Sequence, residues 1–180
     1  MTNNDVYKYF SAHARVDGAI VAAMWIASFF CFVGEFQMPL LSVVAIVLSL
    51  SSLVVLVIRA RKFRDNVLDG EITFGKAMLY CIQTFFHSIL LMALAQYLYF
   101  QFLDHGYMIN QYINMLSTPE YASVAKNVYG IEAKQLIAIL QNTMANVRPI
   151  EIAYQFLTLN VIGCILLSVP IAAMVRRVRS

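Results

Sequence analysis

The sequence predicts an all-α integral membrane protein with four transmembrane helices and a helical segment outside the membrane between the third and the fourth. Of the 180 residues, 61% are hydrophobic and only 13% are charged, whereas soluble domains carry about 45–50% apolar and about 25% charged residues. The mean hydropathy is +0.69, and the apolar residues gather in four long runs. So few charged residues cannot cover a soluble surface, and we therefore treat 1–180 as one membrane domain.

The four runs predict where the helices cross. A helix needs about 20 apolar residues to cross the hydrocarbon core. The first span covers about 18–34, bounded by Asp17, and the second covers about 39–58. The third, about 77–103, is longer than a bilayer requires and should tilt or project beyond it. The fourth, about 152–175, contains Pro170, which should kink it.

The basic residues predict the orientation, because Lys and Arg concentrate on the cytoplasmic side of membrane proteins. Of the thirteen Lys and Arg, ten would share one side, which also holds both termini: Lys8, Arg15, Arg59, Arg61, Lys62, Arg64, Lys76, Arg176, Arg177 and Arg179. The other side would hold a short turn and the segment at about 104–149. Both termini are therefore expected in the cytoplasm.

The segment 104–149 is polar enough to leave the membrane, yet it has helical patterns. Thr118 and Pro119 are typical of a helix start, with Thr118 as N-cap. An apolar stripe follows at spacings of three and four: Ala133, Ile137, Leu140, Met144 and Val147. The stripe could be buried against the outer leaflet, the other helices of the segment or a partner chain. A small helical cap on the protein's own bundle is the simplest interpretation.

Polar residues within the membrane are the first place to look for function. Span three contributes one set on one helix face and span four contributes another: Tyr80, Gln83, Thr84 and His87; Gln155, Thr158 and Asn160. If the two sets meet, they form a polar seam. The seam would be either a cavity for a headgroup, a proton or a small solute, or a set of interhelical hydrogen bonds. We favour hydrogen bonds, because His87 is the only titratable residue expected deep in the membrane and no Asp or Glu is expected to be buried there.

We expect no metal site and no cofactor. The three histidines would lie at three depths, and the sequence has no HExxH, Walker-type, GxSxG or CxxC motif. Basic residues flank the ends of spans two and four: Arg59, Arg61, Lys62 and Arg64; Arg176, Arg177 and Arg179. Because these lie directly against membrane helices, they indicate the orientation, a surface for anionic lipids or a docking site for a partner, and not nucleic acid.

The most distinctive stretch is 69–77, which reads DGEITFGKA and links the basic segment to span three. This pattern, G-x-I-[ST]-F-G-x-A, together with the four spans, the long third loop and the basic C-terminus, resembles a family of uncharacterised membrane proteins with a domain of unknown function, found mainly in Bacteroidota. The resemblance implies a bacterial inner membrane and no activity, and it suggests an association with a glycosyltransferase that uses polyprenyl-phosphate. Thr73 would cap span three, and Gly70 and Gly75 would let the chain turn sharply.

Two functions from different classes follow. The first is a non-catalytic accessory or scaffold subunit, which binds a membrane-associated partner through the basic side. The alternative is a small oligomeric transporter or lipid-handling protein that uses the polar seam. An intramembrane enzyme built on Asp104, His105 and Glu151 ranks last, because nothing in their spacing requires them to meet. The expected partners are membrane lipids and either another protein or further copies of this chain.

Overall fold

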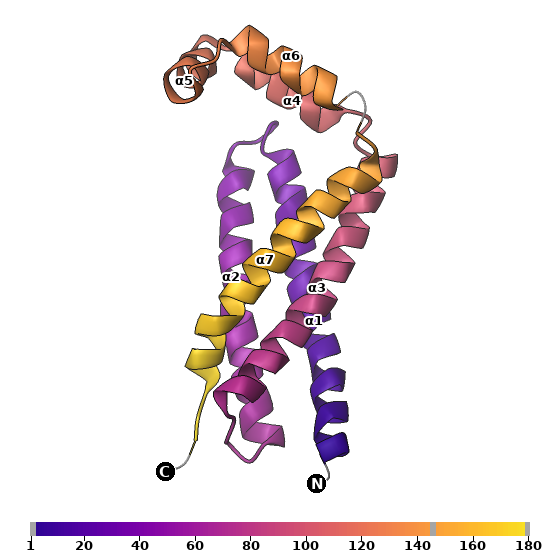
Figure 1. Cartoon of the computed structure of the whole chain (residues 1–180), viewed down its shortest axis with the longest axis vertical. Coiled ribbons are helices and arrows are strands. Elements are labelled where there is room, and N and C mark those ends of the chain that lie inside the picture. The colour runs from indigo at the N-terminus through magenta and orange to yellow at the C-terminus, as the bar shows by residue number, and fades with distance from the viewer. Residues whose placement is uncertain (1–2, 145–146, 179–180) are drawn as a thin grey trace. The chain divides into compact units, whose positions relative to one another are not determined.

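The computed structural model describes residues 3–144 and 147–178, and the fold of this part is helical throughout (Figure 1). The described helices are α1 (Asn3–Gly34), α2 (Leu40–Val67), α3 (Phe74–Phe102), α4 (Tyr107–Leu116), α5 (Pro119–Tyr129), α6 (Ala133–Met144) and α7 (Pro149–Val175). Four of them are long and apolar enough to cross a membrane: Lys8–Gly34, Leu40–Val67, Phe74–Phe102 and Pro149–Val175. The all-α class and the four membrane helices are thus confirmed.

Two of these helices extend well beyond the expected apolar runs. Helix α1 begins at Asn3, so Asp17 lies inside the helix and does not bound it. Helix α2 continues to Val67, so the basic residues from Arg59 to Arg64 lie on a helix and not in a loop. The physical reason is that an apolar run marks only the part inside the lipid, whereas Lys and Arg are good helix formers and allow the helix to continue.

Residue contacts divide the chain into two compact units, 1–95 with 155–180 and 96–154, and helices α3 and α7 contribute residues to both. Within the second unit, helices α4, α5 and α6 contact one another. Asp104 precedes α4 and accepts hydrogen bonds from the Tyr99 hydroxyl (3.0 Å) and the Met108 amide (3.1 Å). The Asp104 carboxylate therefore fixes the start of α4.

Helices α5 and α6 follow the sequence pattern. Thr118 is the N-cap of α5, with Pro119 first in the helix, but its hydroxyl donates to the Met115 carbonyl (2.8 Å) and makes no capping bond. The α6 stripe residues Ala133, Ile137 and Leu140 are half-buried, whereas Lys134, Gln141 and Asn142 opposite them are exposed; the Met144 side chain lies outside the described part. The stripe is thus partly covered.

An exposed ion pair links α5 to the residue before α6. Lys126 Nζ lies 2.8 Å from Glu132 Oε1. The ammonium lowers the pKa of the Glu132 carboxyl, and the carboxylate raises the pKa of the Lys126 amine. Since both groups are solvated, the pair guides the turn and adds little stability.

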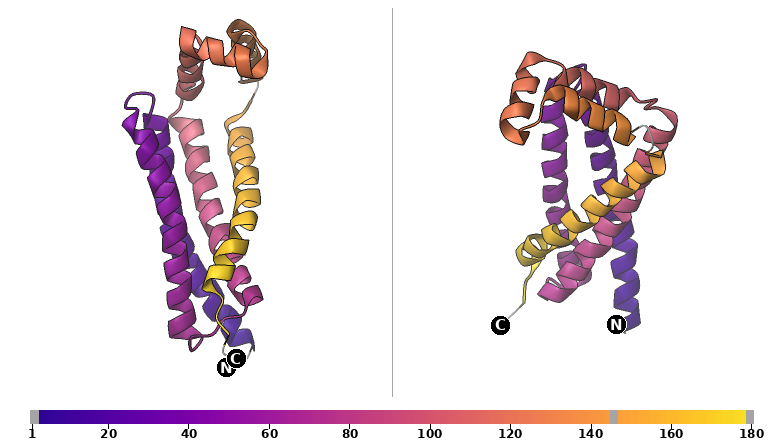
Figure 2. Two further views of the ribbon diagram at one scale, coloured as in Figure 1. Left: turned by 90° about the vertical axis from the view of Figure 1, so that its left-hand side faces the viewer. Right: turned by 45° about the horizontal axis from the view of Figure 1, so that its top comes forward.

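In the first unit, α1 and α2 run side by side and antiparallel, joined by a short turn (Figures 1 and 2). Small hydroxyl residues let the two helices approach. Ser28 donates to the Ala45 carbonyl (2.8 Å), and the Trp25 indole N–H donates to the Ser52 hydroxyl (2.8 Å). Trp25, near the middle of the first span, is therefore held by a hydrogen bond from its polar edge, and its ring stacks on Phe85.

Gly18 sets the distance between α1 and α3. A Cβ atom built on Gly18 would lie 2.8 Å from the Thr84 carbonyl oxygen and 2.8 Å from the His87 Cβ atom. The Ser88 hydroxyl donates to the Gly18 carbonyl (2.9 Å), so the two backbones are also hydrogen-bonded through a side chain. No residue with a Cβ atom fits here unless the helices separate.

Gly18→Ala is expected to lower the free energy of unfolding by about 1–3 kcal/mol, because the methyl group overpacks a contact with backbone. The measurement is reversible unfolding in mixed micelles. Gly163→Ala is the control, since a Cβ atom on Gly163 of α7 meets nothing within 4 Å. That change should be neutral or stabilise the helix by up to about 1 kcal/mol. Equal stability of the two variants would contradict this account of the contact.

Candidate functional site

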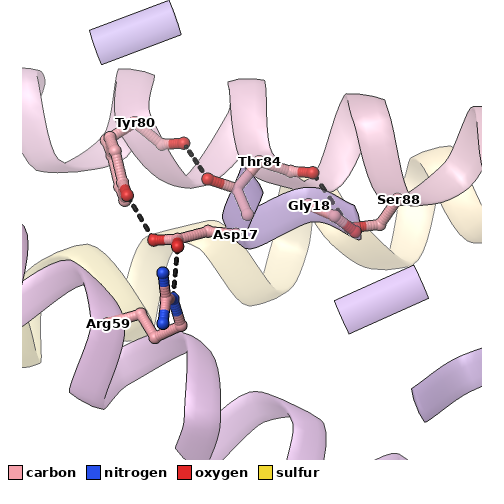
Figure 3. A network of polar contacts seen from close by, with 6 residues as sticks. All are labelled: Asp17, Gly18, Arg59, Tyr80, Thr84 and Ser88. Carbon is pink, nitrogen blue, oxygen red and sulfur yellow. Dashed lines mark hydrogen bonds and ion pairs between the residues drawn. The ribbon is translucent and has the colours of Figure 1, made fainter. Parts of the chain in front are cut away.

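A buried carboxylate ties three helices together at one end of the first unit. This is the end at which α1 begins, α2 ends, α3 begins and α7 ends, and we call it the basic end. Asp17 is only 3% exposed. It accepts hydrogen bonds from the Arg59 guanidinium of α2 and from the Tyr80 hydroxyl of α3 (Figure 3). One side chain of α1 thus meets a cation and a phenol from two other helices.

Asp17 lies on the buried stripe of α1. Phe10, Ala14, Asp17 and Val21 follow one another at spacings of four, three and four, and all are buried. The expectation that no Asp or Glu is buried was therefore wrong. The error came from treating a charged residue as the end of a span, although the helical period continues through it.

The facing stripe of α3 has a hydroxyl residue at every fourth position, namely Tyr80, Thr84 and Ser88, all buried. Thr84 donates to the Tyr80 carbonyl (2.9 Å), and Ser88 donates to the Thr84 carbonyl (2.9 Å), as Figure 3 shows. Phe63 of α2 stacks on the Tyr80 ring at 4.5 Å, and Phe10 meets Phe63 edge-on at 4.9 Å. The aromatic rings shield the carboxylate from water, which strengthens its hydrogen bonds.

The pair of Asp17 and Arg59 is not symmetric in its burial. The Asp17 side chain is 4% exposed and the Arg59 side chain 36%. A carboxylate alone in this position would cost several kcal/mol of solvation, roughly the effective penalty per buried ion. Arg59 offsets that cost while part of its own side chain stays exposed. The arrangement is therefore an ion pair at the edge of the apolar region.

A second anchor joins the end of α2 to the end of α7. The Arg64 side chain is nearly buried and donates to the Val175 carbonyl (2.9 Å) and to both oxygens of Asp65 (2.8 and 3.0 Å). Arg61 donates to the Met174 carbonyl (3.2 Å). The last carbonyls of a helix lack partners and carry partial negative charge, so two guanidinium groups stabilise the end of α7.

The residues after α7 pair with the link between α2 and α3. Ile72 and Arg177 exchange backbone hydrogen bonds of 2.8 and 3.1 Å in an antiparallel pair. The link reaches this pair through a turn in which Asp69 has φ +53° and Gly70 φ +84°. Gly70 thus makes the expected turn, because φ in this range suits glycine. Gly75 does not, since it lies inside α3 without positive φ.

A cavity of about 310 Å³ opens beside this pair. Its lining comes from the end of α2 and the link, from the first turn of α3 and from the residues after α7: Val67, Leu68, Asp69, Glu71, Ile72 and Thr73; Lys76; Arg177 and Val178. Thr73 stands directly before α3, where its carbonyl accepts from the Ala77 amide (2.9 Å). Most of the distinctive stretch 69–77 therefore lines this cavity.

The structure distributes the predicted seam residues over several surfaces. Tyr80 and Thr84 face α1. His87 is half-buried and bonds the Gln83 carbonyl through Nδ1 (2.7 Å), and the Gln83 Oε1 atom is buried without a hydrogen-bond partner among the described residues. On α7, Gln155 and Thr158 are exposed and Asn160 is half-buried.

The groove that α3 and α7 share is almost wholly apolar. It measures about 110 Å³ and is lined by Ile82, Phe85, Phe86 and Ile89 of α3 and by Val161, Cys164, Ile165 and Ser168 of α7. A seam between the polar sets of these two helices stays a prediction.

The basic residues also divide into two groups. Arg59 and Arg64 bond to other helices of the protein, through Asp17 and the Val175 carbonyl. Arg61, Lys62, Arg176 and Arg177 are exposed, and none of them has an ion pair with an acidic residue among those described. We call these four the basic surface. Arg179 lies outside the described residues.

The remaining candidates have local roles. Glu151 pairs with Arg148 (2.8 Å), and Asp104 holds the start of α4. Within the described residues, no three His, Cys, Asp or Glu side chains are placed to hold a metal ion.

A family model matches residues 17–177 and describes a protein of unknown function (DUF4199). The chain belongs to the DUF4199 family. In this DUF4199 protein the matched region begins at the buried Asp17 and ends at Arg177, so it contains both anchors of the basic end. No curated protein and no solved structure matches the chain.

Asp17→Asn is expected to destabilise the protein by about 2–3 kcal/mol, somewhat less than breaking a fully buried pair, because the Arg59 side chain is partly exposed. Tyr80→Phe should cost about 1–2 kcal/mol, since it removes a hydrogen bond to a charged group. The double variant should lose less than the sum, because both changes act on one carboxylate. Unfolding in micelles measures all three.

Tyr97→Phe is the matched control, since Tyr97 is a half-buried tyrosine of the same helix. It should leave the stability within about 0.5 kcal/mol of the parent. Strict additivity of the Asp17 and Tyr80 changes would show that the two side chains do not act as a unit.

Proposed function

We propose that this DUF4199 protein is a non-catalytic accessory subunit of the membrane, which holds a membrane-associated partner at its basic end. The observation that carries the proposal is the basic surface. Arg61 and Lys62 lie near the end of α2, Arg176 and Arg177 directly follow α7, and these two helix ends are fastened to each other. In this proposal the protein lies in a bacterial inner membrane with both termini in the cytoplasm, as the distribution of Lys and Arg indicates.

The charge and the rigidity of this surface both favour a docking role. Four positively charged side chains attract an acidic partner and steer it to this surface. The helix ends beneath them are held by Arg64 and by the pair of Ile72 and Arg177, so little ordering is required when a partner binds. Anionic lipid headgroups compete for the same cations, which restricts docking to partners that already lie at the membrane.

The first class of partner to test is a glycosyltransferase that uses polyprenyl-phosphate. The family resemblance suggests this class, and an enzyme that uses polyprenyl-phosphate acts on a substrate held in the membrane. The partner would carry out the catalysis, and the DUF4199 protein would hold the partner in place at the membrane.

The test is purification of the tagged protein from native membranes in mild detergent, followed by mass spectrometry. The parent protein should retain a stoichiometric partner, and the variant K62E/R176E should lose most of it, because neither side chain has a described intramolecular bond. The control K8E/R15E changes the charge equally on exposed residues of α1 and should retain the partner. A parent protein that purifies without any partner contradicts the proposal.

A transporter or lipid-handling function is the second candidate. It is favoured by the Gln83 Oε1 atom, which is buried without a hydrogen-bond partner among the described residues and lies one helical turn from His87. It gains weight if the parent purifies as a homo-oligomer with bound lipid. The double variant H87L/Q155L should then lose the activity, and a fully active double variant would eliminate this candidate.

A further inference from the structure

We propose that the 310 Å³ cavity at the basic end binds the headgroup of a phospholipid in which a phosphate stands next to a primary ammonium, as in a phosphoethanolamine headgroup. This inference goes beyond the accessory function and does not depend on it. The volume is at the lower end for small-molecule sites, about 300–1,000 Å³, which suits a headgroup without its acyl chains.

The walls of the cavity are fixed before any ligand arrives. The link on one side and the residues after α7 on the other are joined by the two hydrogen bonds between Ile72 and Arg177. The Gly70 amide donates to the Arg64 carbonyl (3.1 Å), which holds the turn against the end of α2. A preformed site loses little conformational entropy on binding, so a few polar contacts suffice for selectivity.

One part of the cavity suits the phosphate. Lys76 lies in the first turn of α3 and Arg177 in the segment after α7, and both line the cavity. Neither side chain has an ion pair among the described residues. The start of this 29-residue helix adds the partial positive charge of its first amides, and the exposed Thr73 provides a hydroxyl donor.

Another part suits a cation. The exposed carboxylate of Asp69 lines the same cavity. A carboxylate would weaken a cavity for phosphate alone, whereas a carboxylate beside cations matches a zwitterion. A primary ammonium donates up to three hydrogen bonds to carboxylates, and a quaternary ammonium donates none. The lining therefore favours a phosphoethanolamine headgroup over phosphocholine, and also over a headgroup that carries only negative charge.

The surroundings place the cavity at headgroup depth. Val67 and Leu68 of its lining lie at the end of one membrane helix, and Thr73 and Lys76 lie at the start of the next. Exposed apolar side chains border the cavity, with Phe74 next to Thr73 and Val178 at the end of the described chain. A headgroup in the cavity leaves its acyl chains beside apolar surface.

The sequence pattern of the link is consistent with this division of roles. Gly70 makes the turn, and the buried Ile72 and Ala77 fasten the link and α3 to the core. The charged residues that line the cavity select the headgroup.

The experiment uses the full chain, purified without a partner, stripped of lipid and exchanged into micelles that contain one phospholipid of matched acyl chains. Native mass spectrometry counts the lipid retained with an ethanolamine, choline or glycerol headgroup. The parent should retain the ethanolamine lipid about tenfold better than the other two, as expected for a few hydrogen bonds to charged groups. Equal retention of the three lipids would overturn the proposal.

Two variants separate the two halves of the headgroup. Lys76→Gln should reduce retention of the ethanolamine lipid about tenfold, by loss of a charged contact with the phosphate. Asp69→Asn should retain lipid but lose the preference for ethanolamine over choline; Asn accepts the positive φ of this position. Lys8→Gln, an exposed lysine of α1 that does not line the cavity, should behave as the parent does. A Lys76→Gln variant with unchanged retention would also overturn the proposal.

A competition experiment distinguishes a membrane phospholipid from a soluble compound with the same phosphoethanolamine group. Free phosphoethanolamine and inorganic phosphate are added at millimolar concentration to the lipid-loaded protein. Retention of the lipid supports a membrane ligand, whereas its displacement by phosphoethanolamine assigns the cavity to a soluble compound and overturns the lipid assignment. If the parent retained the glycerol lipid better than the ethanolamine lipid, and K62E/R176E lost that retention, an anionic lipid would be bound on the basic surface. This result would overturn the proposal. Because no partner is present, none of these outcomes bears on docking.

Discussion

The structure of the basic end depends on one carboxylate inside an apolar bundle. Burial of the Asp17 charge is unfavourable unless a cation and a hydroxyl reach it, and these come from two other helices, as Arg59 and Tyr80. Satisfying the charge therefore fixes the positions of α1, α2 and α3 along one another. Nonspecific apolar contacts in lipid cannot do this, since lipid tails compete with them. The close contact at Gly18, one residue further along α1, follows from the same constraint.

Helix α2 continues beyond its apolar run, and this continuation also fixes the position of the end of α7, the fourth membrane helix. At about 100° per residue, Arg59 and Arg64 point roughly 140° apart around α2. One can therefore reach α1 while the other reaches the end of α7. Arg61 and Lys62 lie between them in the sequence and remain exposed. A short basic segment thus provides two internal anchors and part of a surface, which a flexible loop of the same composition would not do.

Composition and hydropathy were sufficient to predict the class and the four membrane helices, because lipid solvates apolar residues directly and a run of about 20 apolar residues is rare outside a membrane. The buried Asp17 could also have been found, since it continues the spacing of Phe10, Ala14 and Val21. The cavity could not. It depends on the pairing of Ile72 with Arg177, more than a hundred positions later, and such a pairing leaves no local pattern. For the same reason, the sequence alone could not predict which helix packs against the polar face of α3.

The charges of the basic end form a graded series, and this arrangement connects the two proposals. The Asp17 charge is paired with Arg59 inside the protein. Lys76 and Arg177 line a cavity and have no ion pair among the described residues. Lys62 and Arg176 are exposed. A phosphate in the cavity would neutralise the second group and hold the link against the residues after α7. Since any ligand that binds only the folded protein stabilises it, such a lipid would strengthen the platform on which a partner docks. The membrane would then supply a structural component of the docking surface, and partner binding would respond to the lipid composition.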